Sequence, residues 1–534
     1  MSLKAKGLVN TWTMLLLSAA ILAPASWGEL RLADAAKGKD KEAVRSLVQQ
    51  HVDVNAPQGD GTTALMWATH WDDLETTDLL IHAGANVNAA NDNGVTPLWL
   101  ACTNGNAAIV EKLLKGGANP NASLSRTGES VLMTCARTGN VDAVKSLLAG
   151  KAEVNAKDNW SGQTALMWAV AEKHPEVVRV LVGHGADARA RSKVQTDTYG
   201  RTRGGFTPLL FGARVGDLES VRILLAAGAD VNEATPEAGN TLVVASASNR
   251  EELAIFLLEK GANPNSADEY GFTALHHAVQ KGISDLSAIE YTPALLPPRN
   301  QPELVKALLA HGADPNSRIK KDYPASVAPY RHTTPASILG ATPFFLAAAA
   351  GDANIMRLLL AAGADPLLTA GELMRPLMAA AGMTRLVDFL PGEESSHLEA
   401  VKLAVELGSD VNETAKDGET ALHAASFTGA DTIVKFLVDK GANVDAKDKL
   451  GRTPWSMAAA VYPSYGSASS NRLAGVRLHQ STADLLLKLG ATRMTEKDFP
   501  SPSSIRRGEY AEGKAGAERE KIPDRQKTSS VPAR

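Results

Sequence analysis

The chain is poor in the residues that build most catalytic and metal sites. It has two cysteines among 534 residues, and aromatic residues make up 5% of it. Metal-binding spacings such as Cys-x-x-Cys and His-Glu-x-x-His are absent, as are the glycine-rich phosphate loop and the Gly-x-Ser-x-Gly elbow. The net charge of −4 is close to neutral for this length, so nucleic acid is not an expected partner. We expect no catalytic residue, cofactor or metal.

Long apolar runs are scarce as well, and the one that stands out lies near the N-terminus. Residues 14–23 follow Lys4 and Lys6 and precede the small-x-small site Ala23-Pro24-Ala25. The run is too short to cross a bilayer as a mature helix. This order predicts a cleaved secretory signal over residues 1–28, and the alternative is a short uncleaved anchor. We therefore expect an exported bacterial protein, periplasmic or secreted, with no membrane span after cleavage.

What the chain does contain is one short phrase that recurs with a period near 33 residues. The clear copies begin at Thr63, Thr96, Thr164, Thr207, Thr273, Thr342, Thr420 and Thr453, and degenerate copies begin at Ser130, Asn240 and Arg375. Each copy has a small residue five positions after its start, then a Leu-Leu-like pair, then Gly-Ala before Val-Asn or Pro-Asn. A fixed period of this length indicates stacked supersecondary units, which offer a surface for binding rather than a cleft for chemistry.

These features resemble the ankyrin repeat, Thr-Pro-Leu-His-x-Ala in a unit of 33 residues. The resemblance covers roughly residues 30–492 and implies an all-α solenoid of helix-turn-helix units with protruding β-hairpin loops. The motif histidine survives only at His276 and His423, so we expect its hydrogen bond to the turn to be lost elsewhere. Lys151 occupies the helix-ending glycine position of the third repeat, which predicts a strained or altered cap there.

The period also divides the chain into segments. Residues 29–59 are expected to form a degenerate N-terminal capping repeat, residues 60–492 an array of about eleven repeats, and residues 493–534 a disordered charged tail. Extra lengths interrupt the array near 189–203, 283–300, 318–340, 384–397 and 462–480. Insertions of this kind map to loops, often on the binding side.

The two cysteines admit two interpretations. Cys135 takes the small packing position of its repeat, and Cys102 lies one residue past the small Ala101 of the preceding repeat. They are either small buried hydrophobes or a bridge between adjacent repeats. Equivalent positions of stacked repeats are expected to lie about 10 Å apart, beyond disulfide reach, which argues against the bridge.

Large aromatic residues on the predicted hairpins are the best candidates for partner contacts. Trp160, Phe206, Tyr270 and Phe272 fall just before their helices, where an exposed ring has little packing role, and the alternative is a ring folded back onto the neighbouring hairpin. Asn91, Arg126 and Arg452 complete the predicted contact set. The basic hairpin at 189–203 is either a solvated loop or a site for an acidic partner surface or an anionic polymer. Trp67 and Trp168 are predicted to be core residues rather than binding residues.

The sequence therefore predicts non-catalytic binding of another protein through the concave face that the resemblance implies, by a chain that acts as a monomer. Two alternative functions of other classes remain open. One is a structural scaffold or spacer in the cell envelope that has no single binding patch. The other is an enzyme activity housed in the inserted loops, although these loops offer no pair of nucleophile and base.

Overall fold

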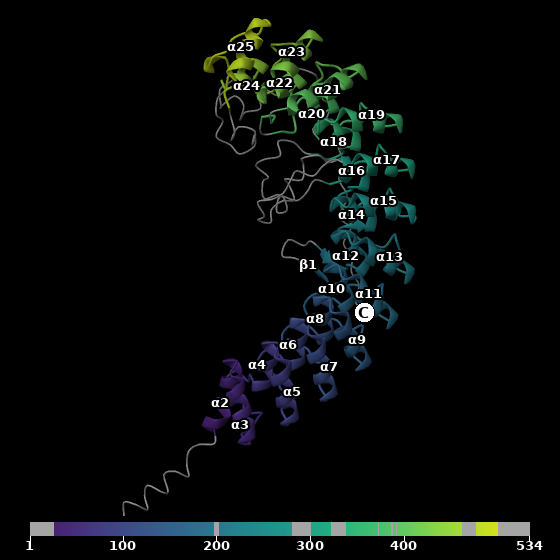
Figure 1. The fold of residues 1–534 in the computed structure, drawn as a ribbon. Coiled ribbons are helices and arrows are strands. Elements are labelled where there is room, and N and C mark those ends of the chain that lie inside the picture. The colour runs from purple at the N-terminus through teal and green to yellow at the C-terminus, as the bar shows by residue number, and fades with distance from the viewer. Residues whose placement is uncertain are drawn as a thin grey trace, which may run out of the picture. The chain divides into compact units, whose positions relative to one another are not determined.

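The computed structural model describes residues 26–196, 202–279, 301–321, 338–371, 373–385, 388–390, 392–461 and 477–499. The chain divides into two bodies. The N-terminal body comprises Met1–Val279 and Pro298–Lys321, and the C-terminal body comprises Gln280–Pro297 and Asp322–Arg534. Both are built from pairs of short helices (Figure 1), and we number the repeats 1 to 11 in the order of the starts at Thr63 to Thr453.

In the N-terminal body the first helices of successive repeats form one layer and the second helices form another (Figure 1). The first helices are α2 (Ser26–Lys37), α4 (Ala64–His70), α6 (Pro97–Asn104), α8 (Val131–Thr138), α10 (Ala165–Ala171), α12 (Pro208–Val215), α14 (Thr241–Ala247) and α16 (Ala274–Val279). The second helices are α3 (Lys41–Gln49), α5 (Leu74–His82), α7 (Ala107–Lys115), α9 (Val141–Ala149), α11 (Pro175–Gly183), α13 (Leu218–Ala226), α15 (Glu251–Glu259) and α17 (Pro302–Ala310).

The C-terminal body repeats the same pairing in repeats 8 to 11. Its first helices are α18 (Pro343–Ala349), α20 (Pro376–Ala380), α22 (Ala421–Phe427) and α24 (Pro454–Ala458). Its second helices are α19 (Ala353–Ala361), α21 (Glu393–Glu406), α23 (Asp431–Asp439) and α25 (Gln480–Lys488), and the 3-10 helix η3 (Glu496–Asp498) follows them. Each predicted repeat start is thus followed by a helix pair, as expected of the helix-turn-helix array.

The repeated phrase makes each first helix begin and end where it does. In repeat 2 the Thr96 hydroxyl accepts a hydrogen bond from Trp99 N at 3.2 Å, and Pro97 takes the first helical position, where it loses no hydrogen bond. Gly105 ends the helix with φ 68°. Asn106 then caps the second helix by accepting from Ile109 N at 3.0 Å. Local capping residues therefore set where the first helix begins and ends and where the second helix begins, independently of how the helices pack.

The core lies between the two helix layers of each body. The small residues five positions after each start are almost fully buried, as Ala68, Ala101 and Ala169 show, because neighbouring first helices approach closely there. Leu113 and Leu147 of the second helices are fully buried as well. Since no repeat can bury these side chains alone, each depends on its neighbours for stability.

An asparagine in the loop after the second helix joins many of the repeats to the next. Asn155 donates from Nδ2 to Gly185 O at 3.0 Å and accepts from Asp187 N at 2.7 Å. The same pair of bonds is made at Asn55, Asn88, Asn121, Asn155, Asn232, Asn265 and Asn412. Arg189 departs from the pattern and donates from Nε to Gly228 O at 2.8 Å.

The departures from the motif have visible structural effects. Lys151 has φ 69°, so it adopts the left-handed conformation that Gly117 adopts with φ 88° in the preceding repeat. His423 keeps the motif hydrogen bond, since its Nδ1 accepts from Thr420 N at 3.1 Å. Where Met133 replaces the histidine, its thioether sulfur lies 3.4 Å from Ser130 N and takes over as a weak acceptor.

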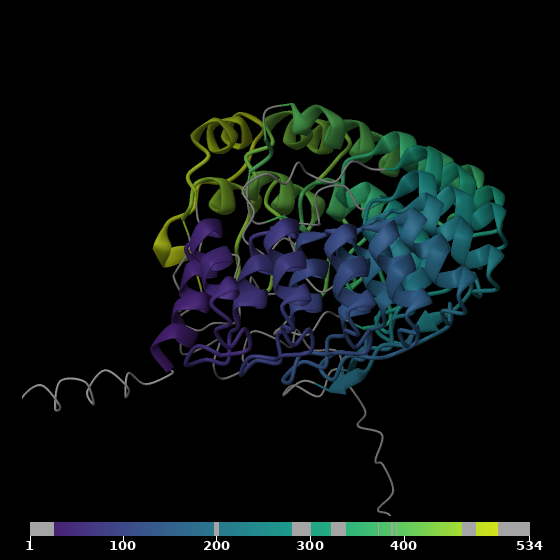
Figure 2. The ribbon, with the colours of Figure 1, turned by 60° about the horizontal axis from the view of Figure 1, so that its bottom comes forward.

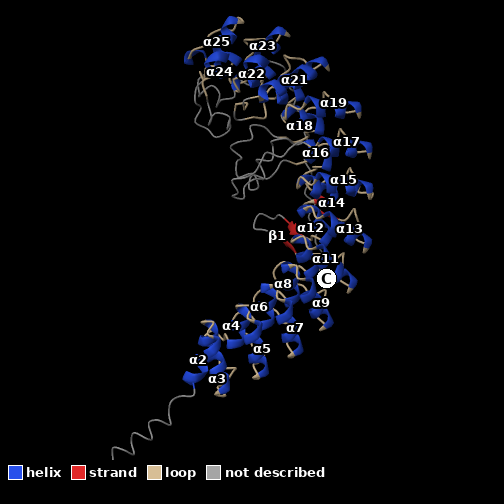
Figure 3. Ribbon diagram, viewed as in Figure 1, coloured by secondary structure: helices blue, strands red, loops and turns tan. Residues whose placement is uncertain are grey.

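Among the residues that the structure describes, strands are few and lie in the loops that precede first helices. β1 (Val194–Thr196) pairs antiparallel with β2 (Thr202–Gly204), and β3 (Ala234–Thr235) pairs with β4 (Gly239–Asn240). In Figure 2 the loops of the purple-to-blue repeats gather along one edge of the helix layers, and Figure 3 marks the β1–β2 strands in red. Within the described residues, no helix is long and apolar enough to cross a membrane.

Several predicted segments lie wholly or partly outside the described residues. These are residues 1–25 of the predicted signal, the insertion at 283–300, most of those at 318–340 and 462–480, and the tail beyond 499. Helix α2 begins at Ser26, inside the predicted signal segment. The insertion near 384–397 leads into α21, and the insertion near 189–203 contains the β1–β2 hairpin.

Candidate protein-binding surface

The hairpin of repeat 4 displays a tryptophan on a fixed turn. Trp160 is 77% exposed and lies four residues before Thr164, which caps α10. The buried carboxylate of Asp158 closes this turn, because it accepts hydrogen bonds from Ser161 N at 2.6 Å and from Gln163 N at 2.9 Å. The indole is therefore exposed on backbone that is already ordered, which lowers the entropy cost of a contact with a partner.

The β1–β2 hairpin of repeat 5 lies against the Trp160 turn. Gln195 donates from Nε2 to Trp160 O at 3.0 Å, and Lys193 N donates to Ser161 O at 2.7 Å. Val194, between these two residues, is 61% exposed. Two neighbouring hairpins thus each expose a large apolar side chain, which is the feature expected of an interface anchor.

Aromatic and basic side chains continue from the hairpins onto the first helices. The rings of Phe206 and Phe211 lie 5.7 Å apart, and the guanidinium carbon of Arg214 lies 5.7 Å and 5.0 Å from their centroids. In the neighbouring repeats, Arg137 lies 6.0 Å from the ring of Trp168. We call the surface formed by Arg126, Arg137, Trp160, Lys193, Val194, Phe206 and Arg214 the hairpin face.

The two polar residues predicted in the early hairpins occupy different environments. Arg126 is exposed, four residues before the N-cap Ser130, so it occupies the position in repeat 3 that Trp160 occupies in repeat 4. Asn91 is half-buried, and its side-chain oxygen accepts from Asn93 N at 3.1 Å and from Val95 N at 3.0 Å. Asn91 therefore shapes its turn, as Asp158 does in repeat 4.

Tyr270, in the hairpin of repeat 7, is half-buried. Its backbone N–H donates to Asp268 at 2.9 Å, and its carbonyl oxygen accepts from Lys320 N at 2.7 Å. Burial raises the pKa of the Asp268 carboxyl to about 6, although hydrogen bonds from the backbone of the turn oppose that shift. The tyrosine therefore belongs to an ordered turn that contacts the next loop.

The expected exposure of Phe272 is wrong. Its side chain is 0% exposed and stacks on His277 with ring centroids 5.4 Å apart. The reason is its position, directly before the N-cap Thr273, where the hairpin meets the helix layer. Phe206 stands at the same position of repeat 5 and is half-buried. A ring at the base of the hairpin packs inward, whereas a ring four residues before the cap points outward.

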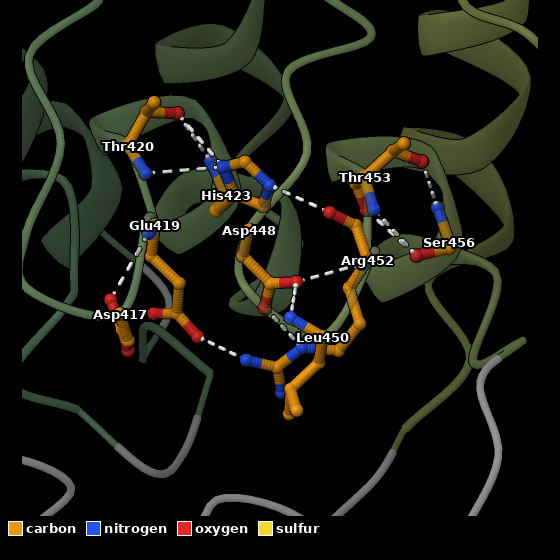
Figure 4. A network of polar contacts seen from close by, with 9 residues as sticks. All are labelled: Asp417, Glu419, Thr420, His423, Asp448, Leu450, Arg452, Thr453 and Ser456. Atoms are coloured by element: carbon orange, nitrogen blue, oxygen red, sulfur yellow. Dashed lines mark hydrogen bonds and ion pairs between the residues drawn. The ribbon is translucent and has the colours of Figure 1, made fainter. Parts of the chain in front are cut away.

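The expected exposure of Arg452 is wrong for the same reason, since it directly precedes the N-cap Thr453. Its side chain is 7% exposed and forms ion pairs with Glu419 at 2.7 Å and with Asp448 at 2.5 Å (Figure 4). Glu419 comes from repeat 10 and Asp448 from repeat 11, so the guanidinium joins two consecutive hairpins. His423 adds a third link, with Nε2 3.1 Å from Arg452 O.

In this network the carboxylates raise pKa values and burial lowers them, and the balance differs between Arg452 and His423. The flanking carboxylates of Glu419 and Asp448 raise the pKa of the Arg452 guanidinium, although burial opposes them. Burial lowers the pKa of the His423 imidazole below its ordinary value, although the same carboxylates oppose that shift. Among the described residues no group of three or more His, Cys, Asp and Glu side chains is arranged to hold a metal ion. The network is a structural clamp between repeats.

The cysteines form a disulfide, so the expectation from distance is wrong. Cys102 of α6 and Cys135 of α8 are bonded, with their Cα atoms 4.6 Å apart, and both side chains are fully buried. The expected separation applies to equivalent positions of adjacent repeats. Cys102 is offset by one residue from the small position that Cys135 occupies, and small residues bring these two helices close together.

Sequence reasoning missed Val194 and Arg214 as parts of the surface. Val194 lies in an insertion, where the repeat pattern supplies no register from which exposure could be predicted. Arg214 lies in the last turn of α12, seven residues after the repeat start, and Arg137 takes the same place in repeat 3. Side chains on a helix lean toward its N-terminus, so counting from the start would have placed Arg214 over the rings of Phe206 and Phe211.

Comparison with known families identifies the repeat. A family model described as "Ankyrin repeats (3 copies)" matches residues 32–124, 117–192, 209–319 and 392–491, and one described as "Ankyrin repeat" matches residues 339–370. These matches cover most of the chain and fall on both bodies.

Curated relatives match over smaller shares. An E3 ubiquitin-protein ligase, KEG, of Arabidopsis thaliana is 27% identical over 48% of this chain and 16% of its own length. The inactive serine/threonine-protein kinase TEX14 of Bos taurus is 33% identical over 18% of this chain and 6% of its own length. The chain therefore spans only a small part of these relatives. The human ASB11 ankyrin repeat domain is 26% identical, with 44% of this chain and 98% of that chain covered and a TM-score of 0.37.

Proposed function

We propose that this chain, which belongs to the ankyrin-repeat family, binds a protein partner through its hairpin face. Ankyrin repeats generally mediate protein–protein interaction, and the family is generally non-catalytic. The observation that carries the proposal is the 77% exposed Trp160 on a turn that Asp158 and Gln195 hold in place. Tryptophan is enriched among the residues that contribute most to binding energy.

The neighbours of Trp160 support this assignment. Val194 adds exposed apolar surface on the adjacent hairpin, and Arg126 occupies the matching tip position one repeat earlier. A cluster of an aromatic anchor, an apolar side chain and an arginine has the composition of an interface centre. Tyr270 and Asn91 belong to the same row of hairpins and form the outer part of the proposed contact surface.

Export is the second part of the proposal. The basic start, short apolar run and small-x-small site support a cleaved signal over residues 1–28. The Cys102–Cys135 disulfide supports the same conclusion independently, because such bonds persist in oxidising compartments and are rare in the cytosol. We therefore propose that the chain acts as a monomer in the periplasm or outside the cell.

Photo-crosslinking tests the binding surface while the partner is still unidentified. A photoreactive amino acid is placed at Trp160 and, in a second variant, at Lys145, which is exposed on the second helix α9. We expect one recurring protein adduct from position 160 in cells that make the chain naturally, and none from position 145. If the same protein were crosslinked at both positions, this would favour the alternative of a scaffold that has no single binding patch.

One substitution distinguishes a role of Trp160 in binding from a role in folding. Trp160→Ala should abolish recovery of that protein while shifting the melting temperature by less than about 1 °C, since surface changes usually cost within ~0.5 kcal/mol. A large fall in melting temperature would show that Trp160 has a packing role. Unchanged recovery with an unchanged melting temperature would exclude the hairpin face as the binding site.

A further inference from the structure

The chemistry of the hairpin face indicates what kind of partner it binds. Arg214 is exposed at the end of α12 and lies over Phe206 and Phe211. Within the described part of the chain no carboxylate lies within ion-pair distance of it. The two rings cover part of the guanidinium, and this partial loss of hydration lowers its pKa. A cation that is held in place by two rings and lacks an acidic neighbour is prepared to pair with a carboxylate from outside.

Other cations surround the exposed apolar side chains of this face. Arg126 is exposed at the tip of repeat 3 and also lacks a carboxylate within ion-pair distance among the described residues. Lys193 precedes the exposed Val194 on the β1–β2 hairpin. The insertion at 189–203 contains Arg189, Arg191, Lys193, Arg201 and Arg203 against the single acid Asp197.

The acidic residues near this face are mostly engaged within the chain. Both carboxylate oxygens of Asp158 accept hydrogen bonds from its own turn. Glu129 accepts from the Thr134 hydroxyl at 2.9 Å and lies 3.7 Å from Arg137. Glu233 is buried and accepts from the Thr207 hydroxyl, and Glu237 lies 4.0 Å from Arg203. Glu172 at the end of α10 is exposed.

We infer that the partner presents an acidic segment that carries at least one large apolar side chain. The apolar side chain packs on Trp160 and Val194, and the carboxylates pair with Arg214, Arg126 and Lys193. The inference rests on the proposed function and names the chemistry of the ligand. It favours a polypeptide over a nucleic acid, because the exposed valine and tryptophan suit an apolar side chain and the chain as a whole has a net charge of −4.

A random 12-residue peptide library, selected on the immobilised full chain, tests this chemistry directly. We expect the enriched peptides to be net acidic and to contain a large aromatic or aliphatic residue. For an enriched peptide, replacement of its glutamates and aspartates by the amides should weaken binding about tenfold at low salt, since charge complementarity is lost. A 12-nucleotide oligothymidine serves as the probe for a general polyanion site.

Two arginine variants locate the charge. Arg214→Gln should weaken binding of the acidic peptide about tenfold and make it less sensitive to salt. Arg222→Gln is the matched control, because Arg222 is also exposed and lies 4.3 Å from the Phe256 ring, but belongs to the second helix α13. It should leave binding unchanged.

The outcomes separate the two proposals. Neutral or basic enriched peptides that still require Trp160 would overturn the acidic ligand and leave the binding surface in place. Peptides that bind equally well to Trp160→Ala would overturn both. Equal losses in the two arginine variants, equal affinity for oligothymidine, or no enrichment at all would each overturn the inference of an acidic polypeptide ligand.

Discussion

Asn88 of repeat 1 holds the backbone at Asn119 of repeat 2. Its side-chain oxygen accepts a hydrogen bond from Asn119 N at 2.7 Å, while its Nδ2 donates to Gly117 O at 2.9 Å. The side-chain oxygen of Asn119 in turn accepts a hydrogen bond from Asn121 N at 3.0 Å. The loop is therefore held by its own hydrogen bonds as well as by those from the neighbouring repeat. An amide side chain supplies a donor and an acceptor on separate atoms, so one asparagine can make both bonds, which explains why the Val-Asn element accompanies the period.

Asn88→Ala should destabilise the N-terminal body by about 1–2 kcal/mol, because two hydrogen bonds between repeats are lost at an exposed site. Urea denaturation followed by circular dichroism should show the first unfolding transition at lower urea. Asn93→Ala is the control, since Asn93 is exposed in a hairpin turn and its side chain makes no hydrogen bond within the described residues. Equal shifts in the two variants would contradict a linking role for Asn88.

The Cys102–Cys135 disulfide should stabilise repeats 2 and 3. The bond closes a loop with a sequence separation of 33 residues, and a disulfide of this kind contributes about 2–4 kcal/mol. We expect the double variant Cys102→Ala/Cys135→Ala to unfold at lower urea than the oxidised chain. Alanine fits at both sites, because it is the usual residue at the position of Cys135 and because Ala213 of repeat 5 occupies the position that matches Cys102.

Reductant supplies the control for the disulfide. Dithiothreitol should lower the unfolding midpoint of the natural chain and leave that of the double alanine variant unchanged. A thiol assay under denaturing conditions should detect no free thiol before reduction. Two free thiols in protein purified from its natural compartment would contradict both the disulfide and the proposed export.

The repeat itself could be predicted from the sequence because its signals are local. Thr96, Pro97 and Gly105 specify the start and end of a helix within a few residues, and the same chemistry recurs in the other repeats. The hairpin residues were harder to place, because exposure there depends on position within the loop. Trp160 and Phe272 are both aromatic residues before a helix, yet one is 77% exposed and the other 0%.

Contacts between repeats were the least predictable part. Arg452 is paired with Glu419, and the numbering places the two in different repeats, so their proximity follows from the stacking geometry and not from local sequence. The Cys102–Cys135 bond depends likewise on a one-residue offset between neighbouring helices. To predict such contacts, one must know the distance between neighbouring helices accurately. The period of the repeat does not give that distance.

Arg452→Met should destabilise repeats 10 and 11 by about 3–5 kcal/mol, because it leaves two buried carboxylates without their cation. The side chains of Glu419 and Asp448 are 2% and 0% exposed, so water does not replace the guanidinium. Hydrogen exchange of α22 and α24 measures the effect locally. Arg477→Met is the control: Arg477 is 62% exposed where it pairs with Asp388, and such surface pairs contribute at most about 1 kcal/mol. Comparable losses of protection would contradict the clamp.

Acidification should weaken the C-terminal body through His423. Burial lowers the pKa of its imidazole in the folded chain, whereas in the unfolded chain it titrates near its ordinary value of 6.5. Below that pH the unfolded state binds the proton and the folded state does not, so stability present above about pH 6.5 is lost as the pH falls. Hydrogen exchange of α22, corrected for intrinsic rates, should show less protection at pH 5.5 than at pH 7.5. In His423→Met, which introduces the residue found at Met133, protection should be lower at both pH values but change less between them. An unchanged pH response in this variant would show that another group is responsible.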